Sequence, residues 1–343
     1  MFHEIKVKQI EHITAQSAVV EFDIPQTLQT EFNFFAGQYL TLEALLEGEA
    51  VRRSYSLCSA PYENRWKVGI KKIPGGRFSS YAKEQLKEGD TLKVSAPEGR
   101  FLLSETKKTF AAFAAGSGIT PIYAMIKEAL QHKDTHFTLV YGNKSPEETL
   151  FYQELRALEK ATPDQLKIHW VYSQANVKDA LFGRIDTAVV NYYWLNKTQE
   201  AEQLFLCGPE GMIDQVKTVL NEKGVKEEQI LFERFTAVQT STEPVNGLEK
   251  GTVEVKIIVD EEEHILQGTN EKTLLDLALQ HKIEVPYSCQ GGVCCSCIGR
   301  IKEGSATMEN NQILTDDEVE EGLVLTCQAK AESAKVVVDF DDV

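Results

Sequence analysis

The most specific chemistry in this sequence is carried by four cysteines. Three of them, Cys289, Cys294 and Cys297, have the spacing C-x4-C-x2-C, and Cys327 follows thirty residues later. Two ferric ions bridged by two sulfides need soft anionic donors at tetrahedral positions, and four thiolates in this spacing supply them. The pattern therefore predicts that these four cysteines hold a [2Fe-2S] cluster.

Cys295 lies in the same region and could, on paper, replace one of its neighbours. Only the set of positions 289, 294 and 297 satisfies both spacings at once, so we take Cys295 as a non-ligand. A zinc site is the alternative, but zinc sites favour two short C-x-x-C pairs. Gly291 and Gly292 would let the loop wrap closely and turn its amides toward the sulfurs. An odd, clustered set of seven cysteines also argues for a reducing compartment and against a disulfide framework.

A second candidate site is the sequence R-x-Y-S, formed by Arg53, Tyr55 and Ser56. An arginine suits the diphosphate of a flavin, and an aromatic ring suits the isoalloxazine face. A small hydroxyl can lie at the flavin edge without blocking the approach of a hydride. An ordinary β-strand with alternating outward charge explains the tetrapeptide equally well.

A glycine turn leads into a predicted helix about twenty residues further along the chain. It contains Gly75 and Gly76, followed by Phe78 and Ser79 at the opening of the helix. Free amides and the helix dipole at such a point favour a phosphate. Alone, the pattern would more often be an ordinary helix capped by Ser79. Its combination with R-x-Y-S favours flavin binding.

A nicotinamide nucleotide is predicted to bind where an apolar strand runs into a glycine turn and then a helix. The turn contains Gly116, Ser117, Gly118, Thr120 and Pro121. Glycines here allow a dinucleotide pyrophosphate to approach the helix N-terminus, and proline suits the first helical turn. The pattern is not the G-x-G-x-x-G of Rossmann dehydrogenases, and a generic strand-to-helix turn would also use glycine and proline.

Two later strands end in residues that we expect at the same edge of a sheet. One ends in Gly142 and Asn143, and the other in Cys207, Gly208 and Pro209. Ligands of an open parallel sheet bind beyond the carboxyl ends of its strands, so these residues are predicted to contact the nucleotide. Cys207 alone would more often be a buried strand cysteine, and its place directly before Gly-Pro favours a role in the site.

These motifs fall in segments of different periodicity. Residues 1–105 contain short alternating runs separated by Gly, Pro and Asp, which predicts an antiparallel β-barrel for the flavin. Residues 106–235 alternate apolar strands with amphipathic helices, which predicts an α/β domain with a parallel sheet for NAD(P). Residues 236–250 are predicted to be a linker, and residues 251–343 a cluster-binding domain. The expected strands are 1–10, 18–22, 39–42, 66–70, 91–94, 110–115, 138–141, 168–172, 204–207 and 253–259. The expected helices are 121–130, 148–158 and 273–280, with one that opens at residues 78–79 and one that follows residue 207.

The composition is that of a globular protein with unevenly distributed charge. Of 343 residues, 42% are hydrophobic and 26% are charged. The first ten residues lack a signal-peptide core, and no apolar run approaches the roughly 20 residues that span a bilayer, so we expect a soluble cytoplasmic protein. From Gly251 onward, 19 acidic and 7 basic residues give a charge of −12, against −4 for the first 250 residues. This disfavours nucleic acid and anionic membranes and suits a partner with a basic patch, although it could serve only solubility.

The order of the motifs resembles two known families. R-x-Y-S, GSGITP and CGP resemble the ferredoxin-NADP reductase superfamily throughout roughly the first 235 residues. This resemblance implies that Ser56, Cys207 and Glu233 surround the hydride path. It also implies that Phe235 lies against the flavin, although Phe232 or Phe235 could equally be core residues. From about residue 251 the chain resembles plant-type ferredoxins, which implies a ubiquitin-like β-grasp fold with a shallow, loop-bound cluster.

Longer phrases such as VRRSYSLCSAP and YSCQGGVCCSCIGRI resemble the reductase subunits of phenylacetyl-CoA epoxygenases and related oxygenases. This resemblance implies electron transfer from NADPH or NADH through FAD and a [2Fe-2S] cluster to a terminal oxygenase that docks near the acidic domain. Phthalate dioxygenase reductases share the domain order but typically hold FMN, so FAD is implied by resemblance alone. Two other functions stay open: a reductase for a hybrid-cluster or other redox protein, and a non-catalytic redox sensor.

The choice between NADPH and NADH also stays open. Lys144 and Ser145 lie where a 2′-phosphate could be bound. Gln174, however, follows Ser173 at a position where NADPH users of this type commonly have arginine. The lack of a bidentate phosphate partner weakens the NADPH alternative.

Overall fold

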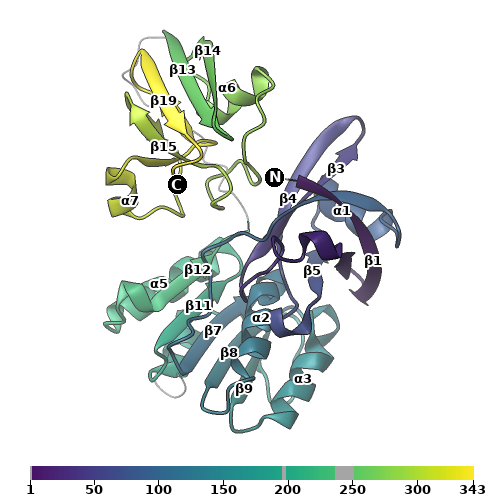
Figure 1. Cartoon of the computed structure of the whole chain (residues 1–343). Helices are drawn as coiled ribbons and strands as arrows, with labels where there is room; N and C mark the ends of the chain where they lie inside the picture. The colour runs from purple at the N-terminus through teal and green to yellow at the C-terminus, as the bar shows by residue number, and fades with distance from the viewer. Residues whose placement is uncertain (1, 195–197, 236–250) are drawn as a thin grey trace. The chain divides into compact units, whose positions relative to one another are not determined.

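The structure is a computed structural model that describes residues 2–194, 198–235 and 251–343. It divides into two compact units, Met1–Phe235 and Thr236–Val343 (Figure 1). The predicted linker, residues 236–250, lies outside the described residues. Within the described parts of the chain, no helix has the length and hydrophobicity needed to span a bilayer.

The first unit begins with a six-stranded antiparallel sheet in the order β4-β3-β6-β1-β2-β5. Its elements are β1 (Phe2–Thr14), β2 (Ser17–Asp23), β3 (Tyr39–Leu46), β4 (Glu49–Ser56), β5 (Trp66–Lys71), α1 (Arg77–Glu84) and β6 (Thr91–Ser95). Burial alternates along β1, where Ile5 and Val7 face the core and Lys6 faces solvent. The two edge strands meet through a bridge between Leu57 and Val68. This closure confirms the predicted barrel.

The rest of the first unit is a six-stranded parallel sheet in the order β10-β9-β8-β7-β11-β12. Its elements are β7 (Thr109–Ala115), α2 (Ile119–Ala129), β8 (His136–Asn143), α3 (Tyr152–Ala161), β9 (Leu166–Tyr172), β10 (Leu181–Phe182), α4 (Thr187–Tyr193), β11 (Gln203–Cys207), α5 (Glu210–Glu222) and β12 (Ile230–Glu233). In β7, Ala112 and Ala114 pack in the core on the α2 side, whereas Ala111 and Phe113 pack in the core on the α5 side. Because both faces are covered, the strands are apolar throughout, as predicted for an α/β domain.

The barrel and the parallel sheet share an apolar core. Cys58 and Phe101 from the barrel side belong to the same buried cluster as Met125 of α2. Gly37 allows the close contact, since a Cβ there would lie 1.9 Å from the Phe101 carbonyl oxygen and 2.5 Å from the Met125 Cε. The barrel and the sheet therefore pack as one body.

The second unit contains a five-stranded sheet in the order β14-β13-β19-β15-β17 and a two-stranded sheet, β16-β18. Its elements are β13 (Thr252–Val259), β14 (Glu262–Thr269), α6 (Leu274–Gln280), β15 (Ile298–Glu303), β16 (Ala306–Met308), α7 (Asp316–Glu320), β17 (Leu323–Leu325), β18 (Ala329–Ala331) and β19 (Lys335–Asp339). Alternate residues of β13 are buried and pack with α6. The first and last strands, β13 and β19, pair in parallel at the centre of the sheet, as the β-grasp fold requires.

Most expected elements are present, with ends shifted by a few residues. The helix expected at 148–158 begins at Tyr152, because residues 146–148 form a 3-10 turn and Phe151 adopts a left-handed backbone with φ of 58°. Strand β10 and helix α4 were not expected. Strand β10 has only two residues, which is too short for a hydrophobic period to be recognised. Helix α4 consists mostly of β-branched and aromatic residues, which have low helix propensity.

Candidate functional site

Three of the predicted residues meet where the barrel adjoins the carboxyl edge of the parallel sheet. Strands β11 and β12 run parallel with Cys207 paired to Glu233. Ser56 is the last residue of β4, and its Oγ donates a hydrogen bond to Glu233 Oε2 at 3.1 Å. Ser56 and Cys207 are both buried. The fold therefore brings together a hydroxyl, a thiol and a carboxyl from distant parts of the sequence.

Burial determines the protonation of these side chains. Glu233 is half-buried as a residue, but its carboxyl group is enclosed by neighbouring atoms. Desolvation raises the pKa of Glu233 to about 8, and the hydrogen bond from Ser56 offsets the rise only in part. Desolvation also raises the pKa of the Cys207 thiol well above its usual value, and Glu233 adds to this. At neutral pH the site therefore presents uncharged polar groups.

The raised pKa of Glu233 predicts how stability depends on pH. The carboxyl has an ordinary value of 4.5 in the unfolded chain and about 8 in the folded protein. Between these values the folded protein holds a proton that the unfolded chain has released. The contribution to stability is therefore complete below pH 4.5 and is lost as the pH rises toward about 8, with a slope of up to about 1.4 kcal/mol per pH unit.

The measurement is the thermal unfolding midpoint between about pH 5 and pH 8. We expect the midpoint of Glu233→Gln to fall less across this range than that of the wild type, because glutamine does not titrate. Glu228→Gln replaces an exposed glutamate and should follow the wild type. Parallel curves for all three proteins would show that the Glu233 carboxyl is ionised in the folded protein.

The predicted nucleotide-binding turn lies against the end of β11. A Cβ on Gly118 would lie 2.1 Å from the Cys207 carbonyl oxygen and 2.8 Å from the Gly208 amide nitrogen. Gly116 has φ of 56°, and its carbonyl accepts a hydrogen bond from the Tyr141 hydroxyl at 3.0 Å. The turn is thus held between β8 and β11, and α2 begins directly beside Cys207. Tyr141 was not predicted, since nothing in its sequence position links a strand tyrosine to this turn.

The remaining nucleotide-binding residues surround the same turn. Thr120 and Pro121 are buried in the first turn of α2, and Thr120 Oγ1 donates a hydrogen bond to the Ser117 carbonyl at 3.0 Å. Pro209 is the N-cap residue of α5. The fold therefore gathers the full predicted set at the carboxyl ends of β7, β8 and β11: Gly116, Ser117, Gly118, Thr120, Pro121, Gly142, Asn143, Cys207, Gly208 and Pro209.

Gly118→Ala is expected to disturb both the site and the fold. The added methyl group would meet the backbone of Cys207, and only a shift of α2 or β11 can relieve that contact. We expect a loss of about 2–3 kcal/mol in unfolding free energy, measured by urea denaturation. We also expect nucleotide affinity to fall about tenfold, because the turn moves.

Gly211→Ala is the matched control for this substitution. A Cβ on Gly211 meets nothing within 4 Å, and helix α5 favours alanine over glycine. This variant should be as stable as the wild type or more stable. If Gly118→Ala were as stable as Gly211→Ala and bound nucleotide normally, the turn could not be packed closely against β11.

The predicted flavin residues surround the junction of β4 and α1. Arg53 is exposed near the end of β4, and the ring of Tyr55 lies 5.6 Å from that of Phe78. Gly76 is the N-cap residue of α1, and among the described residues no side chain caps this end. Gly75 has φ of 73° and open space where a side chain would be. The first turn of α1 is therefore open to an anionic group such as a diphosphate.

Phe78 and Ser79 support the fold around this junction. Phe78 is 1% exposed and packs in the barrel core, so only its backbone lies at the open end of α1. Ser79 lies inside the helix, and it is Gly76 that occupies the cap. The Ser79 Oγ accepts a hydrogen bond from the Ile73 amide and donates one to the Gly76 carbonyl, both at 3.3 Å. It thus holds the glycine turn against the helix.

Burial at the end of the first unit distinguishes Phe232 from Phe235, either of which could be a core residue by sequence alone. Phe232 packs with the core on the α5 side, whereas Phe235 is 43% exposed. Between them, Arg234 forms ion pairs with Glu210 at 2.7 Å and with Asp214 at 2.5 Å. Phe232 is therefore a core residue, and the side chain of Phe235 is accessible to a bound ring. Arg234 was not predicted, because its partners lie on a helix twenty residues earlier.

The four predicted cluster ligands converge in the second unit. The nearby thiols of Cys294 and Cys327 lower the pKa of Cys289, and the thiol of Cys327 lowers the pKa of Cys297. The same proximity raises the pKa of Cys294 and of Cys327. Among the residues that the structure describes, no group of three or more His, Cys, Asp or Glu is arranged to hold a single metal ion. Paired sulfurs instead suit a two-iron cluster, in which each iron takes two thiolates. Cys295 is partly exposed and packs at the edge of the core.

Hydrogen bonds hold the loop that carries the first three of these cysteines. The Asn310 side-chain amide donates to the Gly291 carbonyl at 2.8 Å. Gly292 has φ of 73°, and a Cβ there would lie 2.7 Å from the Asn310 carbonyl oxygen. The Gly291 amide donates to the Cys289 sulfur at 3.4 Å, as expected for a loop whose amides face the sulfurs. Asn310 was not predicted, because it lies 19 residues after Gly291 in the sequence and nothing in the motif indicates this contact.

Three parts of the chain match known domain families. Residues 4–102 match the oxidoreductase FAD-binding domain, and residues 113–218 match the oxidoreductase NAD-binding domain. Residues 257–332 match the 2Fe-2S iron-sulfur cluster binding domain. Each match contains the motif from which the corresponding cofactor was predicted, so the prediction of FAD, a nicotinamide nucleotide and a [2Fe-2S] cluster is confirmed.

Relatives share this arrangement along nearly their whole length. One of the subunits of 1,2-phenylacetyl-CoA epoxidase from Escherichia coli (strain K12) is 35% identical over 99% of this chain and 98% of that protein. The ferredoxin reductase component of 3-ketosteroid-9-alpha-monooxygenase from Rhodococcus rhodochrous is 32% identical over 98% and 96%. Among solved structures, phthalate dioxygenase reductase has a TM-score of 0.62 and 27% identity over 98% of both chains.

Proposed function

Because the chain belongs to the family of oxygenase reductase components that join FAD-binding, NAD-binding and 2Fe-2S domains, we propose that it delivers electrons from NADPH or NADH to a terminal oxygenase. The observation that carries this proposal is the grouping of Ser56, Cys207 and Glu233 between the flavin and nucleotide motifs. The named relatives favour a partner that epoxidises or hydroxylates its substrate.

The residues of the first unit have two kinds of role in this proposal. Arg53 and the amides at the start of α1 hold the FAD diphosphate, and Tyr55 lies against the flavin ring with Phe235 as a second aromatic. The turn from Gly116 to Pro121 holds the nucleotide diphosphate. When bound, FAD accepts a hydride from the nucleotide and passes its electrons one at a time to the cluster.

Ser56, Cys207 and Glu233 line the hydride path. Their burial and neutral protonation keep water and charge away from the reacting atoms. No general acid or base is required for a hydride transfer, so the task of these residues is alignment.

The organisation of the chain follows the same assignment. Residues 1–105 form the FAD-binding barrel, residues 106–235 the NAD(P)-binding domain, residues 236–250 the linker and residues 251–343 the cluster domain. The cluster ligands are Cys289, Cys294, Cys297 and Cys327. The family matches fall inside the three domain ranges, which supports these boundaries.

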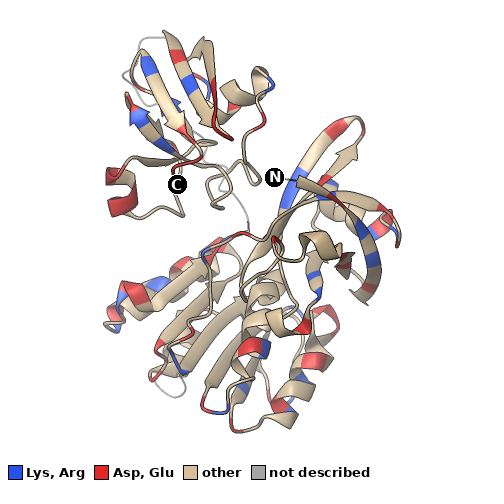
Figure 2. Ribbon diagram, in the orientation of Figure 1, with Lys and Arg blue, Asp and Glu red and all other residues tan. Residues whose placement is uncertain are grey.

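The partner oxygenase docks on the acidic cluster domain. The ribbon of helix α7 carries the colour of acidic residues in Figure 2, and Asp316, Asp317 and Glu320 of this helix are exposed. Helix α7 leads into β17, and Cys327 follows that strand by two residues. A basic patch on the partner would be attracted to this surface, so the rate of reduction of the partner should fall with ionic strength.

The proposal is tested by an anaerobic titration of the purified protein with NADPH and then with NADH, followed by visible absorption. Bleaching of overlapping flavin and [2Fe-2S] bands by one nucleotide at low concentration would support the electron path and identify the donor. Bleaching by neither nucleotide would overturn the reductase assignment. Capture of a diiron or Rieske oxygenase by the immobilised protein would support the partner class.

A further inference from the structure

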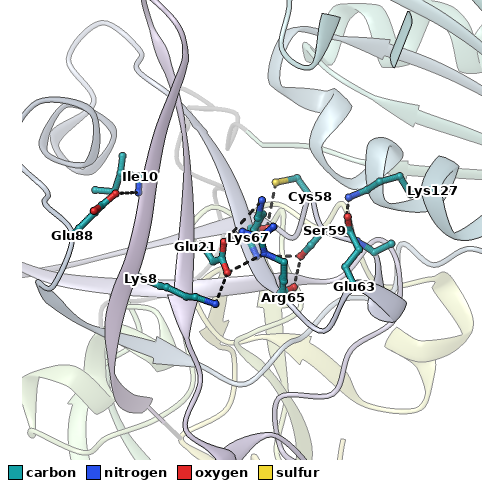
Figure 3. Close-up of polar contacts among 11 residues, drawn as sticks. Lys8, Ile10, Glu21, Cys58, Ser59, Glu63, Arg65, Lys67, Glu88 and Lys127 are labelled. Carbon is teal, nitrogen blue, oxygen red and sulfur yellow. Dashed lines mark hydrogen bonds and ion pairs between the residues drawn. The ribbon is translucent and has the colours of Figure 1, made fainter. Parts of the chain in front are cut away.

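Lys127 is a buried cation that the hydride path does not use. It lies on α2 with a side chain only 9% exposed, and its Nζ donates to Glu63 Oε2 at 2.5 Å (Figure 3). The same nitrogen lies 4.6 Å from the centre of the Tyr123 ring. Glu63 belongs to the barrel, in a 3-10 turn that spans Pro61–Glu63. The ion pair therefore joins the nucleotide-binding helix to the flavin-binding barrel.

Glu63 closes a tightly held turn that starts at Ser56. Its Oε2 also accepts a hydrogen bond from the Ala60 amide at 2.5 Å. The Cys58 amide donates to the Lys67 carbonyl at 2.8 Å, which fixes the start of the turn against β5. A short, hydrogen-bonded segment therefore connects Glu63 to the end of β4, where Ser56 faces Glu233. A change in the position of Glu63 is expected to change the position of Ser56.

The opposite end of α2 touches the barrel at a second point. A Cβ on Gly69 of β5 would lie 2.5 Å from Thr120 Cγ2, so the two elements are in close contact there. Thr120 and Lys127 are seven residues apart, which places them on one face of the helix and about 10 Å apart along its axis. Tyr123 lies between them and stacks on Phe151 at 4.4 Å. Together with the contact of Met125 with Gly37, these two contacts fix the direction of the helix axis.

We propose that the Lys127–Glu63 ion pair is a positioning element for hydride transfer, which holds α2 and its glycine turn in register with Ser56. The expected effect on the rate of hydride transfer rests on the proposed function. Without the ion pair, the segment that carries Glu63 loses its connection to α2, and the end of β4 with Ser56 can shift relative to the glycine turn, which Thr120 holds against Gly69. A displacement of about 1 Å can cost as much as 100-fold in rate.

The test compares four variants with the wild type by anaerobic stopped-flow reduction at saturating nucleotide. Lys127→Met removes the charge, and Lys127→Arg keeps it. Lys127→Met/Glu63→Gln removes both charges and so avoids an unpaired buried ion, whose cost would lower stability alone. Lys108→Met is the matched control, because Lys108 pairs with Asp134 at 3.1 Å on the exposed surface of the same domain.

We expect Lys127→Met and the double variant to reduce the flavin about tenfold more slowly than Lys108→Met, with nucleotide affinity changed less than about threefold. Lys127→Arg should recover at least half of the rate. Chemical reduction by dithionite should be equal in all proteins, because it needs no aligned nucleotide. Wild-type rates in the double variant would overturn the proposal, as would rates in Lys127→Met equal to those in Lys108→Met.

A second readout does not depend on the cofactors. In the apoprotein, amide hydrogen exchange of residues 57–63 and of α2 should be faster in Lys127→Met and in the double variant than in Lys108→Met. Unchanged exchange would overturn the positioning role even if the rates fell. If the wild type were not reduced by either nucleotide, the proposed function would fail, while the exchange measurement would still decide whether the ion pair fixes α2.

Discussion

The Cys297→Ala protein is expected to lose its iron, and its rate of electron delivery to a protein acceptor should fall at least about 100-fold. Cys297 is 1% exposed and close enough to Cys327 for that thiol to lower its pKa, so by the proposed assignment alanine removes one of the four thiolates that hold the cluster. Nucleotide-driven reduction of ferricyanide should remain within about twofold of the wild type, because the first unit has its own core.

Cys295→Ala is the control that makes this result specific. It changes a cysteine two residues away but, by our assignment, no ligand. It should retain about two irons per chain and the full rate with a protein acceptor. The ligand assignment would be wrong if Cys295→Ala lost the iron while Cys297→Ala kept it. Both measurements, iron content and acceptor rate, use the same preparations.

The second large effect is expected at Glu233. Glu233→Ala removes the hydrogen-bond partner of Ser56 and, in the proposed function, opens space beside the hydride path. We expect the rate of flavin reduction by nucleotide to fall about 100-fold, since alignment is the main contribution of this site. Glu233→Gln should stay within about fivefold of the wild type at pH 7, because the carboxyl with its raised pKa is largely neutral there and an amide can replace it.

The comparison of these two variants shows whether Glu233 acts as a neutral hydrogen-bonding group or as a negative charge. If Glu233→Gln were as slow as Glu233→Ala, the negative charge would be needed and the uncharged site described above would be incorrect. Glu128→Ala is the control, because burial also raises the pKa of Glu128 on α2. It should change the rate less than about twofold, since Glu128 is not part of the hydride path. The measurement is stopped-flow reduction under anaerobic conditions.

The sequence was sufficient to predict the fold class because each segment has a distinct period. Alternation in β1 and β13, and apolar strands such as β7 between amphipathic helices, indicate a barrel, a β-grasp sheet and an α/β domain. The motifs were predicted together with the elements that carry them, because glycine turns and strand ends have fixed places in such sheets. The roles of individual residues remain predictions.

Contacts between distant segments could not be predicted in the same way. Phe78 stands beside a glycine turn in the sequence, yet only the closed barrel shows that its ring is a core residue. The partner of Lys127 lies 64 residues earlier, and neither residue belongs to a recognisable motif. The ion pairs of Arg234 with helix α5 also join residues that are far apart in the sequence. Long-range ion pairs depend on how two elements pack, and spacing along the chain carries no information about that.

The packing of Gly37 against Phe101 and Met125 has a consequence for protein engineering. Because one apolar cluster spans the barrel and the parallel sheet, neither can be exchanged for a counterpart from a relative without matching this contact surface. The second unit buries its own core between α6 and a sheet that pairs its first and last strands. It is therefore built as an independent domain. If the partner docks on this domain, as we propose, a gene fusion that replaces it is expected to change the electron acceptor.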